Sequence, residues 1–386
     1  MMSAAGPDPA VPPVLRRARE LAPLLATCAA DTERAGDLDP RSLAALVDAG
    51  MFSLFAPGGL TGADRGLATS VAVFAALGRG CGASAWVAMI LSVGGAIASL
   101  LGDEVRAQIW DSDPKAAVAS VISANGTSRR VRGGWRVSGR WQPASGIRHA
   151  KWVLLGVPLE ADRALALIPV RDVRIVPTWS VSGLRGTGSE TVEVDDVFVA
   201  EDRIVSMAKA AVGGYTAQRP DEPFAAIPVE ALCATTVFAP LLGMAEAAVA
   251  QAVDTVRERG AIAGTGDPRA AGSPATRMKI ATAASLVDSA WLHADRAVGD
   301  VTAAMRARRI PDSAALSRIA MDAGVISTSV RTAVGLALDV SGMRAFATGN
   351  PLQRIWRDVE ITCTHQLLTP DTSRERYGRV LLDLDS

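Results

Sequence analysis

The stretch Ser341–Asp371 reads SGMRAFATGNPLQRIWRDVEITCTHQLLTPD, and it shows the helical organisation of the chain clearly. Asn350 provides a side-chain N-cap, and Pro351 takes the first helical position, where the missing N–H of proline costs nothing. Apolar residues then recur at spacings of four, three and four, which predicts one buried stripe of an α-helix: Leu352, Trp356, Val359 and Cys363. If the helix continues, His365 lies on the opposite face together with Asp358. The pattern therefore predicts a helix that buries one face and directs an imidazole from the other.

The composition is that of a globular chain without a strong electrostatic field. Hydrophobic residues make up 49% and charged residues 21% of the 386 residues, enough for two or three domains or layers. Forty basic and forty acidic residues cancel, so the sequence predicts neither a nucleic-acid surface nor a polybasic membrane contact. The four cysteines are scattered without a CxxC pair, which predicts no metal site and favours reduced thiols in the cytoplasm.

One segment is apolar enough to raise the question of a membrane span. Ala83–Gly102 contains twenty residues without a charge, which is long enough to cross a bilayer. It is rich in Ala, Gly and Ser and has no flanking basic asymmetry, and a helix that is apolar all round also suits the centre of a soluble bundle. We interpret it as a core helix. The first residues lack the features of a signal peptide.

The periodicity of the chain divides it into three parts and a linker. Helical spacing dominates residues 1–115, short strands fill 116–212, a linker occupies 213–224, and long helices return in 225–386. This predicts a mainly α protein with a central β-barrel or sandwich and a C-terminal four-helix bundle. The predicted helices are Val14–Glu33, Pro40–Gly50, Leu67–Leu77, Ala83–Leu101, Asp103–Trp110, Ile227–Arg259, Ala275–Ala307 and Asp312–Asp339. The predicted strands are Ala117–Ser123, Arg129–Val131, Trp135–Trp141, Trp152–Val157, Ala164–Val170, Arg174–Val176 and Thr191–Val194.

Several motifs in this order resemble one protein family. NPLQRIWRD followed by His365, SGRW-x-x-ASG followed by HA-x-W, and DAGMFSLFAPGGLTG resemble the acyl-CoA dehydrogenase superfamily, and most of all the oxygenase components of two-component flavin-dependent monooxygenases. The resemblance covers nearly the whole chain. It implies reduced FMN or FAD delivered by a separate NAD(P)H-dependent flavin reductase, and molecular oxygen as co-substrate. It also implies a C4a-hydroperoxyflavin, a homotetramer or homodimer, and an aromatic or polyketide-like substrate.

The resemblance also assigns roles to individual residues. Counting back from Ala150, Ser145 is the hydroxyl residue that contacts flavin N5, and with His365 it forms the expected catalytic pair. Further flavin contacts are expected in the strand region, from Ser120 and from Thr187 and Ser189. Trp86, in the helix after the GRGCG stretch, is expected beside the flavin. Across a subunit boundary, the resemblance implies contacts from Arg257 (or Arg277) and from the turn Ser341-Gly342. The substrate pocket is expected between the loop Met51–Gly66, the helix of Ala83–Gly102 and the linker near Tyr215.

Each of these residues also has a purely structural interpretation, and three other functions stay open. Gln366 stands where many acyl-CoA dehydrogenases carry a glutamate base, and an amide cannot accept the substrate's α-proton. An acyl-CoA dehydrogenase that holds its base elsewhere is nevertheless an alternative, as is a monooxygenase that hydroxylates an amine or amino-sugar nitrogen. A helical scaffold without flavin is a third. The segment MILSVGGAIAS lacks the second histidine found in several phenol hydroxylases, which bears on the substrate and not on oxygen activation.

Overall fold

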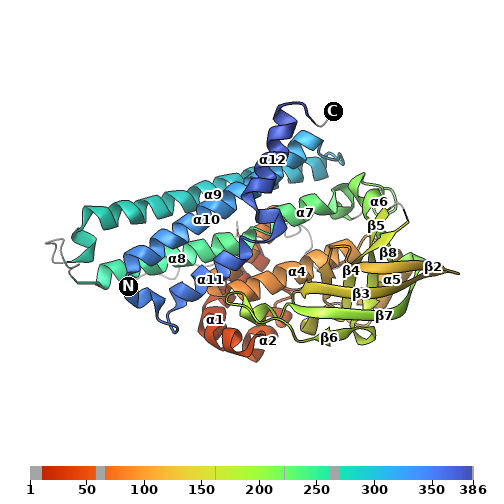
Figure 1. The fold of residues 1–386 in the computed structure, drawn as a ribbon, viewed down its shortest axis with the longest axis horizontal. Coiled ribbons are helices and arrows are strands. Elements are labelled where there is room, and N and C mark those ends of the chain that lie inside the picture. The colour runs from red at the N-terminus through yellow and green to blue at the C-terminus, as the bar shows by residue number, and fades with distance from the viewer. Residues whose placement is uncertain (1–10, 58–65, 161, 221, 261–268, 385–386) are drawn as a thin grey trace.

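A β-domain at one end and a bundle of long helices at the other give the molecule its elongated form (Figure 1). The computed structural model describes residues 11–57, 66–160, 162–220, 222–260 and 269–384. Helix α4 (Gly82–Ala98) lies between the two ends, next to the β-domain on one side and to the bundle on the other. The arrangement agrees with the predicted order of helices, strands and helices.

The N-terminal helices form where the sequence predicts them. They are α1 (Pro13–Ala35), α2 (Pro40–Asp48), α3 (Leu67–Gly80), α4 and α5 (Asp103–Trp110). Residues 58–65 of the predicted loop lie outside the described residues, but its first part, 51–56, is buried in the core. Apolar side chains such as Phe52 and Phe55 explain this burial, because packing them into the core removes apolar surface from water that an exposed loop would leave solvated.

The β-domain consists of two four-stranded sheets that pack face to face. One has the order β1-β4-β5-β8 and the other β2-β3-β7-β6; all pairs are antiparallel except β1 with β4. The Trp141 indole joins them by donating to the Gly156 carbonyl oxygen at 2.8 Å. The strands are β1 (Val118–Val121), β2 (Gly126–Val131), β3 (Gly134–Ala144), β4 (Trp152–Leu159), β5 (Asp162–Pro169), β6 (Arg174–Val176), β7 (Glu190–Ala200) and β8 (Ile204–Ser206).

Two features of this domain differ from the prediction. Strand β8 was not predicted, and β7 runs on to Ala200 instead of ending at Val194. A register shift in the β3–β7 ladder and a positive φ at Asp196 interrupt the alternation of side chains there, so the apolar period was lost at the Asp195-Asp196 pair.

The C-terminal helices are α7 (Val229–Thr236), α8 (Ala239–Glu258), α9 (Pro274–Arg306), α10 (Ser313–Ser341), α11 (Pro351–Thr362) and α12 (Pro370–Leu381). The prediction of one helix over Ile227–Arg259 was wrong, because the structure divides it before Pro240, which cannot supply a backbone donor. The predictions for α9 and α10 are confirmed to within two residues.

Helix α11 confirms one part of its prediction and corrects another. The Asn350 side chain accepts from the Leu352 backbone N–H at 2.9 Å, and Pro351 begins the helix as predicted. The helix ends at Thr362, however, so His365 does not lie on it. Asp358 is buried rather than on a polar face. His365 instead caps a short 3-10 turn, η9 (Gln366–Leu368), and its position is set by this turn.

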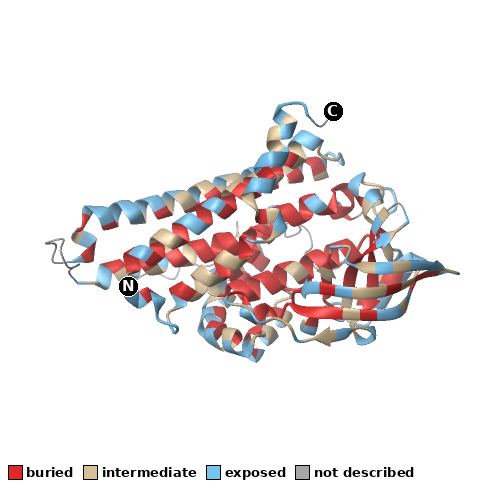
Figure 2. Cartoon of the chain, in the orientation of Figure 1, coloured by how far each residue is buried: buried red, intermediate tan, exposed pale blue. Residues whose placement is uncertain are grey.

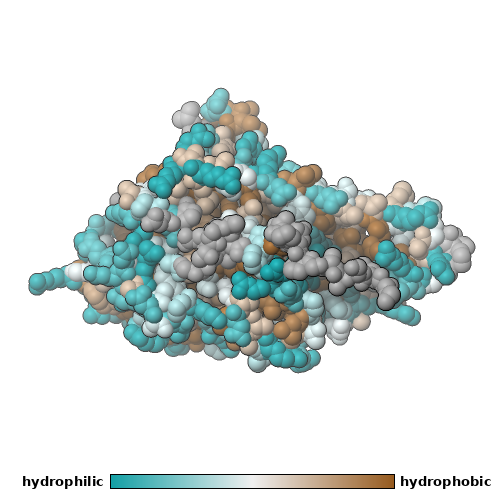
Figure 3. Space-filling view, turned by 180° about the vertical axis from the view of Figure 1, so that it is seen from behind, coloured by the Kyte–Doolittle hydropathy of each residue, from teal (hydrophilic) through white to brown (hydrophobic). Residues whose placement is uncertain are grey.

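The apolar helices belong to the core of the fold. Helix α4 is buried along almost its whole length, and Figure 2 shows it as a nearly continuous red ribbon. Two longer stretches, Val229–Glu258 and Ser313–Ser341, have the length and hydropathy of membrane spans, but 83% and 61% of their apolar windows are buried within the described fold. The reverse face of the molecule is mostly hydrophilic with scattered apolar patches (Figure 3). All four cysteines are free and buried.

Candidate active site

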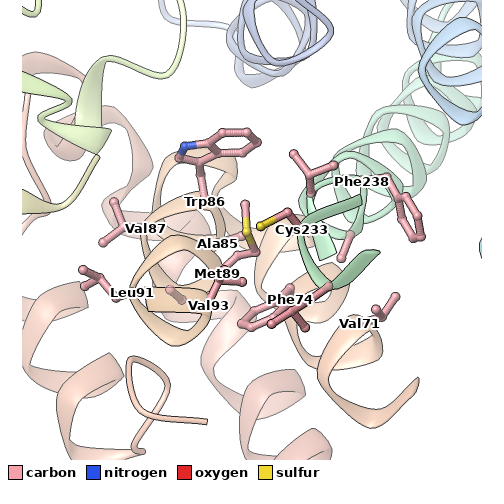
Figure 4. Packing of buried hydrophobic residues seen from close by; sticks show 14 of the residues in the cluster. Val71, Phe74, Ala85, Trp86, Val87, Met89, Leu91, Val93, Cys233 and Phe238 are labelled. Carbon is pink, nitrogen blue, oxygen red and sulfur yellow. The ribbon is translucent and has the colours of Figure 1, made fainter. Parts of the chain in front are cut away.

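A pocket of about 370 Å³ lies where α4, the β-domain and the end of α11 meet. Five of the residues expected to bind flavin or to act in catalysis line it: Trp86, Ser120, Ser145, Ser189 and His365. Trp86, Met89 and Val93 project from α4, and Cys233 from α7 approaches Met89 below the Trp86 ring (Figure 4). Residues from three separate parts of the sequence therefore share one cavity.

Ser145 sits at the turn that follows β3, and a glycine brings this turn close to α4. Gly146 has φ +69°, and a Cβ on it would lie 2.9 Å from Val87 Cγ1. A side chain at position 146 would strain the backbone and push the turn away from α4. The close approach lets the Trp86 indole N–H donate to Ser145 Oγ at 3.1 Å.

Thr187 lies directly behind the pocket wall and not in it. Its hydroxyl is 2.6 Å from Ser189 Oγ, and Ser189 Oγ is 2.7 Å from Ser145 Oγ. Thr187 also donates to the Leu184 carbonyl oxygen at 2.8 Å. Of the three hydroxyl residues expected to bind flavin on these loops, two face the cavity and the third supports them from behind.

Two buried carboxylates, in a role that the sequence did not indicate, hold the loop of residues 178–189 against the rest of the protein. Glu190 accepts from the backbone N–H groups of Thr178 and Trp179 at 2.6 and 2.9 Å. Asp358 of α11 accepts from the Leu184 N–H at 2.6 Å. The sequence signal for Asp358 was the RD pair in α11, but nothing in the chain indicated its partner.

The environment of Asp358 changes its acid–base behaviour. The side chain is 7% exposed, and burial raises the pKa of the carboxyl to about 7, against the opposing effects of the Leu184 N–H and of Arg354. The carboxyl is consequently part-protonated near neutral pH. Its second oxygen faces α4, since a Cβ built on Gly82 would lie 3.3 Å from Oδ2.

His365 enters the pocket as a neutral imidazole. Burial lowers its pKa to about 4, and its ring meets Trp86 edge-on with 5.6 Å between centroids. Nδ1 accepts from the Leu367 backbone N–H at 3.3 Å, which leaves the ring proton on Nε2. In this tautomer the nitrogen free for a ligand is a hydrogen-bond donor.

The remaining lining is apolar or uncharged. None of the described residues around this pocket is Asp, Glu, Lys or Arg. Burial raises the pKa of the Cys233 thiol to about 12, so it stays protonated and is no nucleophile. In the described part of the chain, no group of three potential metal ligands occurs. Apolar walls with hydroxyl groups and one imidazole fit the ring system of a flavin and an aromatic substrate, whereas a flavin phosphate finds no cation here.

Several predicted residues lie away from this pocket in the single chain. Arg257 is exposed and pairs with Asp254, and Arg277 donates to the carbonyl oxygens of Ala271 and Gly272. Ser341 Oγ donates to the Ala337 carbonyl oxygen, and Gly342 adopts φ +73° as a turn residue. The roles of Arg257, Ser341 and Gly342 toward a flavin stay predictions.

The predicted walls of the pocket are only partly those observed. Helix α4 lines it, but the described part of the loop Met51–Gly66 does not, and neither does Tyr215. The Tyr215 hydroxyl instead accepts from the Ser206 N–H at 2.9 Å. Their place is taken by the end of α11 and the turn η9, which the sequence analysis treated as continuous helix.

Comparison with known proteins points in one direction. The family model of the C-terminal domain of acyl-CoA dehydrogenases matches residues 235–370. The chain is 31% identical over 373 residues to the oxygenase subunit HsaA of a flavin-dependent monooxygenase from Rhodococcus jostii, covering 94% of this chain and 97% of the relative. It is 30% identical over 386 residues to the oxygenase component of an FADH2-dependent resorcinol hydroxylase from a Rhizobium strain, covering 96% and 94%. The solved structure of XiaF from Streptomyces, in complex with FADH2 and glycerol, superimposes with a TM-score of 0.90 at 28% identity, covering 96% of this chain and 95% of that one.

Proposed function

This chain belongs to the oxygenase components of two-component flavin-dependent monooxygenases, which have the acyl-CoA dehydrogenase fold, and we propose that it hydroxylates an aromatic molecule held in the pocket that Trp86 and His365 line. The observation that carries the proposal is the pocket that combines Ser145 with a neutral, donor-form His365. Reduced flavin, when bound, supplies the two electrons with which one atom of O2 enters the substrate and the other leaves as water.

Different residues of the pocket would bind the flavin, orient the reacting oxygen and exclude water. Ser145 Oγ would contact the flavin ring, with Trp86 fixing the hydroxyl and Ser120 and Ser189 adding polar contacts at the rim. His365 Nε2–H would donate to an oxygen atom of the substrate or of the bound dioxygen unit, and orient it. The apolar walls would exclude water from the reacting atoms.

The alternative activity of an acyl-CoA dehydrogenase lacks its base at this pocket. That reaction removes an α-proton and needs a carboxylate. Position 366 carries an exposed glutamine, and the described lining residues include no Asp or Glu. An imidazole that holds its own proton on the exposed nitrogen does not replace that base. This favours oxygenation, and an aromatic substrate is preferred over an amine because no described carboxylate lines the pocket of Ser145 and His365. A second cavity next to it does contain Glu230, but Arg163 and Arg376 line that cavity too.

The size of the site supports a substrate larger than a single ring. A second cavity of about 340 Å³ adjoins the first and shares part of its wall with it: Ile122, Ser123, Cys233, Gln366 and Leu367. A flavin ring in the first cavity would leave the second available for the distal part of the substrate. We therefore propose a multi-ring aromatic or polyketide-like substrate. We also propose that the protein lies in the cytoplasm.

The proposed function is tested by mixing the anaerobic protein and reduced FMN, or reduced FAD, with oxygenated buffer. We expect the absorbance of oxidised flavin to appear with a delay relative to free flavin, and for one flavin more than the other. Product analysis with resorcinol, p-hydroxyphenylacetate, indole and a multi-ring phenol then measures hydroxylation, with the multi-ring phenol expected to be turned over fastest. Flavin oxidation as fast as without protein, together with no product from any of these compounds, would contradict the proposal.

A second prediction concerns the flavin phosphate. No described cation lines the pocket, so we propose that Arg257 of a neighbouring subunit neutralises the phosphate in a homotetramer or homodimer. Light scattering should then show an oligomer, and Arg257→Ala should weaken reduced-flavin binding about tenfold.

The matched control for Arg257 is Arg306→Ala, which removes another exposed arginine, at the last turn of α9. It should leave flavin affinity unchanged. A monomer that binds reduced flavin at full strength, or equal effects of the two substitutions, would show that Arg257 has no such role.

A further inference from the structure

Three buried hydroxyl groups form an unbranched hydrogen-bond chain behind the pocket. It runs from the Trp86 indole through Ser145, Ser189 and Thr187 to the carbonyl oxygen of Leu184, with distances of 3.1, 2.7, 2.6 and 2.8 Å. Ser145 is 6% exposed, and Thr187 and Ser189 are each 1% exposed. Each hydroxyl therefore depends on its protein partners for hydrogen bonding.

The direction of every bond in this chain follows from counting protons. A carbonyl oxygen only accepts, so Thr187 donates its one hydroxyl proton to Leu184. Thr187 must then accept from Ser189, and Ser189 in turn must accept from Ser145. The hydroxyl proton of Ser145 is therefore donated to Ser189 and is not available to a ligand in the pocket.

The other end of the chain fixes what Ser145 offers to the pocket. An indole N–H only donates, so Trp86 occupies one lone pair of Ser145 Oγ. The second lone pair is left for a ligand. As long as the chain is intact, Ser145 can accept a hydrogen bond from a ligand but cannot donate one.

The Leu184 carbonyl at the end of the chain is itself held in place. It also accepts from the Trp179 indole at 3.0 Å and from the Thr187 backbone N–H at 3.1 Å, while the Leu184 N–H donates to Asp358. Leu184 has φ +49°, a left-handed conformation that turns its peptide groups toward these partners. The acceptor that orders the chain therefore does not depend on any ligand.

From this geometry we propose that Thr187 is a positioning residue that, through Ser189 and Ser145, makes the pocket prefer reduced over oxidised flavin. The proposal rests on the proposed function, in which Ser145 contacts the flavin ring, and on N5 as the contacted atom, which the family resemblance implies. Reduced flavin carries a hydrogen on N5 and donates, whereas oxidised flavin presents only a lone pair there. A Ser145 hydroxyl that can only accept forms a hydrogen bond with N5–H of reduced flavin, and it is repelled by the N5 lone pair of oxidised flavin.

The size of the preference follows from the cost of an unmatched buried polar contact. When oxidised flavin binds, the lone pair of N5 faces the lone pair of Ser145 Oγ, so one hydrogen bond is lost and both buried atoms stay unsatisfied. The cost corresponds to a preference for reduced flavin on the order of tenfold to a hundredfold. For a two-electron couple, each tenfold preference for the reduced form raises the midpoint potential of the bound flavin by about 30 mV. Thr187 would in this way set a property of the bound cofactor without touching it.

The test uses Thr187→Val, which keeps the shape of the side chain and removes its hydroxyl. Ser189 then loses its acceptor and can donate to Ser145, which frees the Ser145 proton to point into the pocket. Dissociation constants are measured for oxidised and dithionite-reduced FAD and FMN under anaerobic conditions, with the midpoint potential of the bound flavin as a second readout. We expect the ratio of the oxidised to the reduced dissociation constant to fall about tenfold, mainly through tighter binding of oxidised flavin, and the potential to fall by about 30 mV.

Two further variants make the result specific. Thr187→Ser keeps a hydroxyl and should keep the wild-type ratio. Ser189→Ala removes the acceptor of the Ser145 proton and should lower the ratio as Thr187→Val does, so the proposal can be tested even if one variant does not fold. A general loss of structure would weaken both redox states and would not tighten oxidised flavin.

The outcomes separate this inference from the proposed function. A wild-type preference for reduced flavin that both Thr187→Val and Ser189→Ala diminish supports it. A wild-type preference that folded forms of both variants retain, or equal wild-type binding of both redox states, overturns it while leaving the monooxygenase assignment intact. Failure of the wild-type protein to bind either reduced flavin overturns the placement of the flavin at Ser145 and this inference with it.

Discussion

His365→Ala is expected to lower the rate of substrate hydroxylation about a hundredfold while oxygen consumption continues. The physical reason is the loss of the Nε2–H donor that, in the proposed function, orients the reacting oxygen. Without it, oxygen reduction should end in hydrogen peroxide instead of hydroxylated product. The measurement is a single-turnover experiment that quantifies product, peroxide and oxygen, with the compound that the wild-type protein hydroxylates fastest.

His365→Asn provides the matched control. An amide can donate from the same side of the pocket, so part of the coupling between oxygen use and product should return. Reduced-flavin binding should change little in either variant, because the proposed function assigns His365 a contact with the reacting oxygen and not with the flavin ring. Equal coupling in the wild-type protein and in His365→Ala would remove this residue from the mechanism.

The pH dependence separates a donor from a general base. With a pKa of about 4, His365 is neutral throughout the range from pH 6 to 8. Coupling should therefore be flat across that range, without the ionisation near 6.5 that an unperturbed histidine base would show. A limb near 6.5 that disappears in His365→Asn would instead identify His365 as a base.

Sequence reasoning succeeded here where the determinants are local. The cap by Asn350 and the start at Pro351 depend on neighbours in the chain, and the structure contains both. The hairpin between β2 and β3 is also local, since Val131 pairs with Gly134 and the two-residue turn Arg132-Gly133, with φ +80° at Gly133, joins the strands. Such elements carry their own signals.

The site could be predicted only in part because it is assembled from contacts between distant segments. The bond from Leu184 to Asp358 spans 174 positions, and that from Trp86 to Ser145 spans 59. Family resemblance indicated Ser145, Ser189 and His365, which share the pocket, but gave no reason to place Thr187 behind it. Nor did the helical period reveal that α11 ends at Thr362, because the turn there is stabilised by tertiary packing.

Another large effect is expected from the charge on Asp358, and the pKa of this carboxyl gives the direction of the change in stability with pH. Burial raises the pKa of this carboxyl from its ordinary 3.8 to about 7 in the folded protein. Between these values the folded state binds a proton that the unfolded state has lost, so the free energy of unfolding falls as pH rises through this window. The stabilising contribution is fully present below 3.8 and is lost once the pH has passed about 7.

Asp358→Asn removes this titration and keeps an oxygen to accept from the Leu184 N–H. From pH 5 to pH 7 the unfolding free energy of the wild-type protein should therefore fall relative to the variant by about 1.4 kcal/mol per pH unit, and the difference should level off above about pH 8. Urea unfolding at pH 5, 6, 7 and 8 measures it. The charges that face Asp358 are Arg354 and Arg357 on α11 and Glu33 on α1, and all three are present in both proteins.

Asp288→Asn, at an exposed carboxylate on α9, controls for charge removal in general and should give a difference that does not vary over this range. A pH-independent difference for Asp358→Asn would mean that the buried carboxyl does not hold its proton. The variant also distinguishes the two tasks of Asp358, since Asn retains the hydrogen bond to Leu184 but carries no charge. If reduced-flavin binding survives while the pH slope disappears, the hydrogen bond to Leu184 is sufficient to hold the loop with Thr187 and Ser189. The negative charge is then not needed for flavin binding, and it only lowers the free energy of unfolding above neutral pH.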